Sequence, residues 1–109
     1  MKNKNIIRVK RGTGNVFANL GFPYPEQEQL KASLTLRIYL IIKARKLTQA
    51  QAGEILGIKQ PHVSGLMRGQ SGAYSVERLM KFLTALGQDV EIKVRSARKR
   101  HGEMSVVLG

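Results

Sequence analysis

Apolar side chains recur at intervals of three and four residues between residues 25 and 46. This spacing places them on one stripe of a helix of about 20 residues, so we expect that stripe to be buried. Pro25 suits the first helical position, and Glu26 and Glu28 suit the positive N-terminal end of the helix. The predicted buried stripe consists of Leu30, Leu34, Ile38, Ile41 and Ile42.

Two shorter helical patterns follow, separated by about four residues. Thr48 and Gln51 have the spacing of a capping box, in which the hydroxyl and the amide each satisfy a backbone N–H at the start of a helix. This helix is expected to run to Leu56, because Gly57 suits the left-handed conformation that ends helices. The second pattern lies in G-I-K-Q-P-H-V-S-G-L-M-R-G, residues 57–69. Its apolar positions at helical spacing are Val63, Leu66 and Met67.

A last helix and a strand are predicted in the C-terminal third. Ser75 suits the cap of a helix that ends at Gly87. Residues 89–95 then alternate strictly between charged and apolar side chains, which is the period of a half-buried strand. Residues 102–108 are a candidate partner strand, with S-A-R-K-R-H as the connection. The buried stripe predicted for the last helix consists of Val76, Leu79, Met80 and Leu83.

These elements predict a mainly α fold of four to five helices with a short C-terminal β-strand or hairpin. The 109 residues suffice for one domain, and the chain contains no internal repeat. Residues 1–22 lack a clean helical period, although Ile6, Ile7 and Val9 can form a short strand and residues 15–23 one helical turn. We therefore divide the chain into a basic N-terminal arm (1–22), a helical domain (23–87) and a C-terminal strand with a basic tail (88–109).

The charge of the chain narrows the class of partner. The formal net charge is +12, and the excess is concentrated at the two ends. Residues 1–11 carry five basic groups and residues 95–100 carry four, with no acidic group in either segment. Such ends suit a polyanion, because neutralising phosphates releases condensed counterions. The alternative from charge alone is a solvated basic surface with mobile tails, and charge does not separate DNA from RNA or from an acidic protein.

The composition argues against several other classes of function. The absence of cysteine excludes disulfides and thiolate metal sites, and two histidines far apart in the sequence do not make a metal site. No apolar run approaches the roughly 20 residues of a membrane-spanning helix, and the N-terminus lacks the apolar core of a signal peptide. We expect a cytoplasmic protein without cofactor, metal or catalytic residues. The glycines at Gly12 and Gly14 are not followed by a lysine at phosphate-loop spacing.

The short helical pair has the composition of a helix-turn-helix. Two helices that cross steeply over one turn need small residues where they touch, and Ala52 and Gly53 supply them. The segment T-Q-A-Q-A-G-E-I-L-G-I-K-Q-P-H-V-S-G-L-M-R-G, residues 48–69, resembles the helix-turn-helix of Xre, or lambda-repressor-like, DNA-binding domains. Those domains typically read T-Q-x-x-L-A-x-x-L-G-[IV]-S-Q-x-x-[IV]-S-x-x-E-x-G. The resemblance implies a lambda-repressor-like helical bundle and a DNA-binding transcriptional regulator that is not an enzyme.

The chain departs from this pattern at four positions. The family usually has a larger apolar residue at Ala52 and alanine at Gly53. Glycine inside a helix costs roughly 1 kcal/mol relative to alanine. Lys59 replaces the usual serine cap of the second helix, and Met67 stands where an acidic residue is common. None of these changes is incompatible with the fold.

The flanking segments resemble a compact branch of the same family. G-T-G-N-V-F-A-N-L-G-F, before the long helix, and A-L-G-Q-D-V-E-I-K-V-R, after the last one, are similar to HigA-type antitoxins. Such antitoxins are encoded beside a RelE/HigB-like toxin that cleaves mRNA, which implies autoregulation of the operon and toxin neutralisation. The alternatives are a stand-alone phage-type or chromosomal repressor without a toxin partner, and, on charge alone, a non-specific RNA-binding protein.

The resemblance and the helical period together define a candidate DNA-binding face. With Val63, Leu66 and Met67 inward, about 100° per residue turns the other side of the second helix outward. Its N-terminal residues then face base edges in the major groove. Gln60 matches the family's base-reading glutamine and can bond an adenine edge, and Thr48 and Gln49 resemble its phosphate clamp. The predicted DNA-binding residues are Thr48, Gln49, Lys59, Gln60, Pro61, His62, Ser64, Gly65 and Arg68.

The residues of this face have different expected roles. Lys59 and Arg68 are candidates for phosphate contacts, and Pro61 offers only an apolar contact, for instance to a thymine methyl. His62 is either a donor to DNA or an ordinary exposed polar residue. One such helix makes few base contacts, so we expect a homodimer on an inverted repeat of double-stranded DNA, with the C-terminal strand as a candidate interface.

A toxin partner would need a different surface from the DNA-binding face. Toxins of this type bind mRNA and tend to be basic, so a partner with a net charge of +12 is electrostatically unexpected. The contacts are therefore expected to be apolar or to use the few acidic residues. We expect them in residues 1–22 and 88–109, because these are not needed to build the helix-turn-helix. The acidic candidates are Glu26, Glu28 and Glu103.

Overall fold

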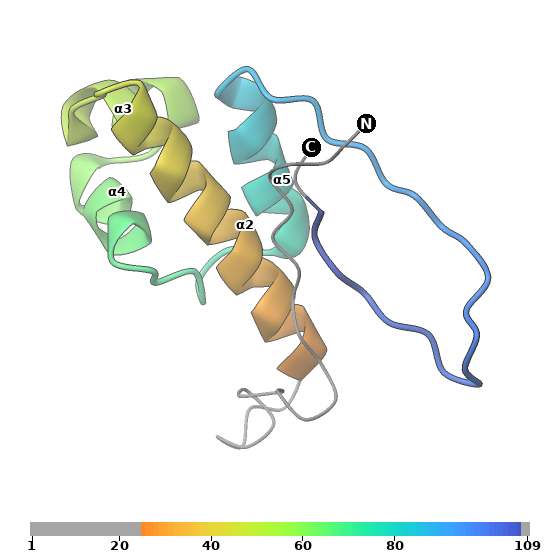
Figure 1. Ribbon diagram of the computed structural model, residues 1–109. Coiled ribbons are helices and arrows are strands. Elements are labelled where there is room, and N and C mark those ends of the chain that lie inside the picture. Colours follow the sequence, from red (N-terminus) through yellow and green to blue (C-terminus); the bar gives the residue numbers. More distant parts are fainter. Residues whose placement is uncertain (1–24, 108–109) are drawn as a thin grey trace.

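A computed structural model describes residues 25–107 of the chain, and this part contains four α-helices. The long helix α2 is central: α5 packs along it and α4 packs against it, while α3 packs on α4 (Figure 1). The predictions for residues 1–24, including the short strand, the helical turn and the basic N-terminal arm, lie outside the described residues. The helices are α2 (Pro25–Ala44), α3 (Gln49–Leu56), α4 (Gln60–Met67) and α5 (Val76–Ala85).

The sequence prediction for α2 is confirmed in length and in buried face. The helix has 20 residues, and Ile38 and Ile42 are almost completely buried. Leu34 and Ile41 are buried beside them, whereas Leu30 is only half-buried. The apolar stripe therefore forms one side of the core, as its spacing predicts.

The end of α2 is fastened to the end of α5. The Nη1 atom of Arg45 donates a hydrogen bond of 3.1 Å to the carbonyl oxygen of Leu86. Lys46 has a left-handed φ of 55°, and the backbone N–H of Leu47 donates to the carbonyl of Ile42 at 3.1 Å. These bonds satisfy carbonyl groups that a helix end leaves without a partner.

The core is closed by α5. Its cap is as predicted, since the Ser75 hydroxyl accepts from the backbone N–H of Arg78 at 3.0 Å and Gly87 is left-handed with φ of 86°. Leu79 and Leu83 are buried and Val76 and Met80 are half-buried, in agreement with the predicted stripe. The complete buried core consists of Leu34, Ile38, Ile41, Ile42, Ala52, Leu56, Val63, Leu66, Leu79, Phe82, Leu83 and Leu86.

The aromatic part of this core was not predicted. Phe82 is 2% exposed, and its ring meets the ring of Tyr74 edge to face at a centroid distance of 5.2 Å. The guanidinium of Arg78 lies over the Phe82 ring at 5.1 Å. Tyr74 belongs to the loop before α5, so this cluster fixes that loop against the helix.

The predicted C-terminal strand is wrong for the single chain. No strand is present among residues 25–107. Residues 89–95 form the outgoing limb of an open loop, and this limb lies apart from the returning limb (Figure 1). A strand requires a neighbour that bonds its backbone N–H and C=O groups, and residues 102–107 do not provide one. The chain returns only at Val106, which packs half-buried against the core. Within residues 25–107, no helix has the length and apolar character required to cross a membrane.

Candidate nucleic-acid interface

The start of α3 is held by the capping box that its sequence predicts. The Thr48 hydroxyl accepts from the backbone N–H of Gln51 at 3.0 Å, and the Gln51 side-chain oxygen accepts from the backbone N–H of Thr48 at 2.8 Å. These two bonds define where the helix begins, and the helix then buries Ala52, Gly53 and Leu56. Thr48 is exposed and Gln49 is half-buried, so the N-terminal end of α3 lies at the surface.

The turn between α3 and α4 is built around two glycines. Gly57 is left-handed with φ of 75°, and its N–H donates to the Gly53 carbonyl at 2.8 Å. The same carbonyl accepts from the N–H of Ile58 at 3.1 Å. A Cβ atom on Gly53 would lie 2.7 Å from the carbonyl oxygen of Ile58, too close for any side chain. The glycine in α3 is therefore required by the close approach of the turn, which its sequence position alone does not reveal.

The inner face of α4 is as predicted. Val63 and Leu66 are buried and Met67 is half-buried. Lys59 occupies the N-cap position without a side-chain cap, as expected from the replaced serine. Pro61 lies in the first turn, where its missing N–H costs no helical hydrogen bond.

The outer face of α4 presents polar side chains at its N-terminal end. Lys59, Gln60, Pro61 and His62 are consecutive and all exposed. Ser64 and Gly65 are half-buried rather than fully outward. A Cβ atom on Gly65 would lie 3.2 Å from the Oε1 atom of Gln70. Gln70, in the loop after α4, was not among the predicted site residues.

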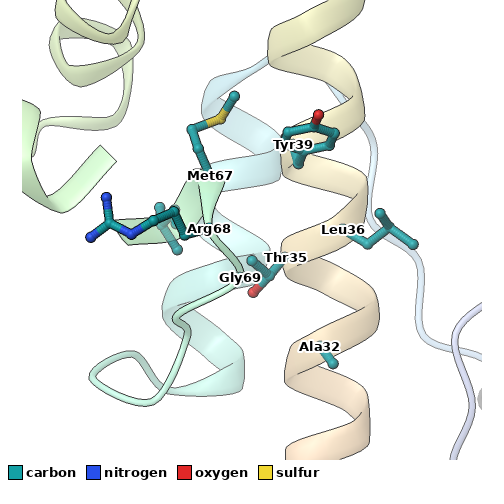
Figure 2. Close-up of a pocket in the computed structure, with 8 residues that line it drawn as sticks. Ala32, Thr35, Leu36, Tyr39, Met67, Arg68 and Gly69 are labelled. Carbon is teal, nitrogen blue, oxygen red and sulfur yellow. The ribbon is translucent and has the colours of Figure 1, made fainter. Parts of the chain in front are cut away.

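Arg68 is oriented by its own helix. Its Nη1 atom donates a hydrogen bond of 2.6 Å to the hydroxyl of Ser64, one turn earlier. Arg68 also borders a groove between α2 and the end of α4, but its side chain extends away from that groove (Figure 2). The guanidinium is therefore aligned with the exposed side of α4. The groove itself is lined by Ala32, Thr35, Leu36, Tyr39, Leu66, Met67, Arg68 and Gly69.

The segment of the chain that carries α4 has positive charges only. Residues 57–75 contain no Asp or Glu, whereas Lys59 and Arg68 are exposed at the two ends of the helix. The N-terminal ends of α3 and α4 add partial positive charge. The arrangement has the chemistry of a surface for phosphates, with amide and imidazole groups available between the two cations.

Comparisons with known proteins agree with this geometry. A family model described as a helix-turn-helix domain matches residues 16–95. A solved structure titled "Putative XRE Family Transcriptional Regulator" is similar to this chain, with a TM-score of 0.75 and 40% sequence identity. The match covers 80% of this chain and 100% of that one.

A curated relative extends the comparison. It is named "Putative antitoxin HigA2", from Mycobacterium tuberculosis (strain ATCC 25618 / H37Rv), and is 38% identical over 52 residues. These residues are 48% of this chain and 52% of the relative, so the chain spans about half the length of that protein.

Proposed function

Because the chain belongs to the XRE-type helix-turn-helix family of transcriptional regulators and is HigA-like, we propose that it represses its own operon by binding a specific sequence in double-stranded DNA. We further propose that it is the antitoxin of a type II pair and neutralises a RelE/HigB-like toxin. The curated relative named as a HigA2 antitoxin supports this second part.

The exposed N-terminal end of α4 is the observation that carries the proposal. Gln60 is exposed at the start of α4, and the residues one turn later, Ser64 and Gly65, are small and half-buried. A glutamine amide matches the donor and acceptor of an adenine edge, and Pro61 offers an apolar contact to a thymine methyl. We therefore assign base recognition to Gln60 and Pro61, with His62 beside them.

The phosphate contacts are assigned to residues on either side of these base contacts. Lys59 and Arg68 supply charge at the two ends of α4, and the Ser64 hydroxyl holds Arg68 in place. We assign Thr48 and Gln49, at the N-terminal end of α3, to a further phosphate contact, since Thr48 is exposed and Gln49 half-buried. These contacts fix the orientation of the helix on the duplex without reading its sequence.

Because α4 is short, specific binding to DNA requires a second copy of the chain. Eight residues of helix, Gln60–Met67, are about 12 Å long and can contact only a few base pairs. We propose that a homodimer binds an inverted repeat whose half-sites are about one helical turn apart. In this scheme residues 23–87 form the DNA-binding domain, and residues 1–22 and 88–109 serve other contacts.

Titration with DNA tests the proposal that the protein is a sequence-specific repressor. Duplex from the region upstream of the protein's own coding sequence is compared with a shuffled duplex of the same composition, at several salt concentrations. We expect the upstream duplex to bind more tightly by at least a hundredfold, given the usual range of specific over non-specific affinity. Equal affinity for both duplexes would exclude a sequence-specific repressor.

Co-expression with the neighbouring gene tests the proposal that the protein is an antitoxin. The neighbouring reading frame is expressed alone and together with this chain, and growth and co-purification are measured. Toxicity that this chain relieves, with formation of a stable complex, is expected. If the neighbour is harmless alone, the chain is instead a stand-alone repressor, and the operator experiment is unaffected.

Two of the three acidic candidates for the toxin contact are already paired within the chain. Glu28 already pairs with Lys31 at 3.8 Å, and Glu103 with Lys99 at 3.2 Å. A basic toxin would have to compete with these intramolecular pairs. We therefore place the toxin contact mainly on apolar and backbone groups of residues 1–22 and 88–109.

A further inference from the structure

Residues 88–107 form an open arm, and a row of apolar side chains on it is exposed to solvent. Val90, Ile92 and Val94 are 37%, 73% and 88% exposed, although their alternation is that of a half-buried strand. Met104 and Val107, on the returning limb, are also about half exposed. Isolated apolar residues at a surface are ordinary, but an alternating row on an unpaired segment indicates a missing partner strand.

The charged residues of the same segment indicate which strand is missing. The sequence D-V-E-I-K-V-R, residues 89–95, is symmetric about Ile92 in its apolar positions and antisymmetric in its charges. Asp89 and Glu91 precede the centre, and Lys93 and Arg95 follow it. Such a segment is electrostatically complementary to a second copy of itself running in the opposite direction.

We propose that residues 89–95 of two copies pair as antiparallel strands about a two-fold axis at Ile92. Opposite residues are then Glu91 and Lys93 of the partner subunit, and Asp89 and Arg95 of the partner subunit. Val90 faces Val94 of the partner subunit, and Ile92 faces its own equivalent. One face of the two-stranded ribbon is entirely apolar and the other carries four ion pairs.

Other registers are worse on the same grounds. A shift of the axis to Glu91 or Lys93 brings two like charges face to face at the centre. A slip by one residue places apolar side chains opposite charged ones and mixes the two faces. Parallel pairing in register sets every charge against its own equivalent. Only the axis at Ile92 satisfies all four charged positions of the segment.

The position of the arm is compatible with DNA binding. In Figure 1 the arm leaves the helices on the side of α5, while α4 lies on the opposite side of α2. Pairing through the arm therefore leaves the exposed face of α4 free. The inference rests on the proposed function only in that it supplies the dimer that an inverted repeat requires.

Single cysteines test the register directly, because the chain has no cysteine of its own. In Ile92→Cys the two thiols face each other, at the Cα separation of about 4.5–5.5 Å that disulfides accept. In the control Val90→Cys the two thiols are about 14 Å apart along the strands. All these side chains are exposed, so the helices should fold normally, which circular dichroism verifies.

We expect mild oxidation to cross-link Ile92→Cys into a dimer within minutes at micromolar concentration. Val90→Cys alone should stay monomeric on a denaturing gel, whereas a mixture of Val90→Cys and Val94→Cys should cross-link. Cross-linking of Val90→Cys alone, or none in Ile92→Cys, would overturn the proposed register. No DNA is used, so this result is independent of operator binding.

Charge reversal provides a second test by analytical ultracentrifugation at low salt. Glu91→Lys alone and Lys93→Glu alone each set like charges opposite each other and should weaken the dimer about tenfold. The double variant restores opposite charges and should recover the wild-type dissociation constant. An equimolar mixture of the two single variants should form heterodimers in preference to either homodimer. Additive weakening in the double variant would contradict the pairing.

Discussion

Gly53 illustrates how one missing side chain determines the position of a functional helix. Its position in α3 is helical, where alanine is intrinsically more stable by about 1 kcal/mol. Yet a Cβ atom there would meet the carbonyl oxygen of Ile58 at 2.7 Å, and this oxygen belongs to the backbone of the turn. The turn can avoid the contact only by moving, and α4 follows the turn directly.

Replacing this glycine should therefore destabilise the protein. We expect Gly53→Ala to lower the free energy of unfolding by about 1 kcal/mol, because an overpacking cost of about 1–3 kcal/mol exceeds the gain in helix propensity. The matched control is Gly65→Ala, whose Cβ atom would meet only the flexible end of Gln70. Urea denaturation should show the control unchanged or more stable. A higher free energy of unfolding for Gly53→Ala would mean that the turn can move to accept the added Cβ atom.

Arg68 provides a second test at the scale of the residue. The hydrogen bond from Arg68 to Ser64 holds the guanidinium at the exposed side of α4, where we assign it to a phosphate. Arg68→Ala should weaken binding to all duplexes alike, by about 1–2 kcal/mol, and reduce the salt slope by about 1.

The control for Arg68 is Arg100→Ala, which removes an exposed charge from the C-terminal arm, and the outer end of that arm lies away from α4 (Figure 1). Its salt slope should remain that of the wild type. If Arg68→Ala instead changes the preference between sequences, the guanidinium contacts a base and our assignment is wrong. Fluorescence anisotropy with two duplexes at four salt concentrations separates these results.

At the scale of the helices, local rules predicted most of what is observed. The capping box at Thr48, the left-handed Gly57 and the cap at Ser75 each depend on neighbours within four residues, so the sequence is sufficient to predict them. Contacts between distant residues were missed for the same reason. Tyr74 packs on Phe82, eight residues later, and Gly53 approaches the carbonyl of Ile58, five residues later, so both contacts depend on how the chain folds back beyond one helical turn.

Substitutions at the two helix caps, Thr48 and Ser75, distinguish an effect on stability from an effect on DNA binding. Thr48→Ala and Ser75→Ala each remove a hydroxyl that accepts a backbone N–H at a helix start, and each should cost about 1 kcal/mol of stability. Both residues are exposed, and only Thr48 is assigned to the DNA contact. We therefore expect Thr48→Ala to weaken DNA binding under conditions where both variants are fully folded, and Thr48→Ser to restore it. Equal affinities of the two alanine variants would remove α3 from the interface.

At the scale of the whole molecule, part of the positive charge lies away from the candidate DNA-binding face. The segment 95–100, which carries four basic residues, lies at or near the far end of the open arm, away from α4 (Figure 1). The net charge of +12 therefore gives a general attraction to polyanions, whereas recognition is assigned to the neutral Gln60 between two cations of α4.

The structure of the arm could not be predicted from the sequence alone. The alternation of residues 89–95 predicts a strand, but a strand forms only where a second strand is present, and the single chain offers none. The period of a segment describes which faces it can bury, and it does not say which molecule buries them. The charge symmetry about Ile92 supplies that missing information in our proposal.

We propose that Gln60 on α4 reads a base of the protein's own operator, and a comparison of wild type with Gln60→Ala tests this assignment. Both proteins are titrated against the upstream duplex and against variants with single base-pair changes in each half-site. We predict that Gln60→Ala loses about 1–3 kcal/mol on the wild-type operator and no longer discriminates at one or two positions, while non-specific affinity is unchanged. If Gln60→Ala discriminates at all positions as the wild type does, Gln60 does not read a base.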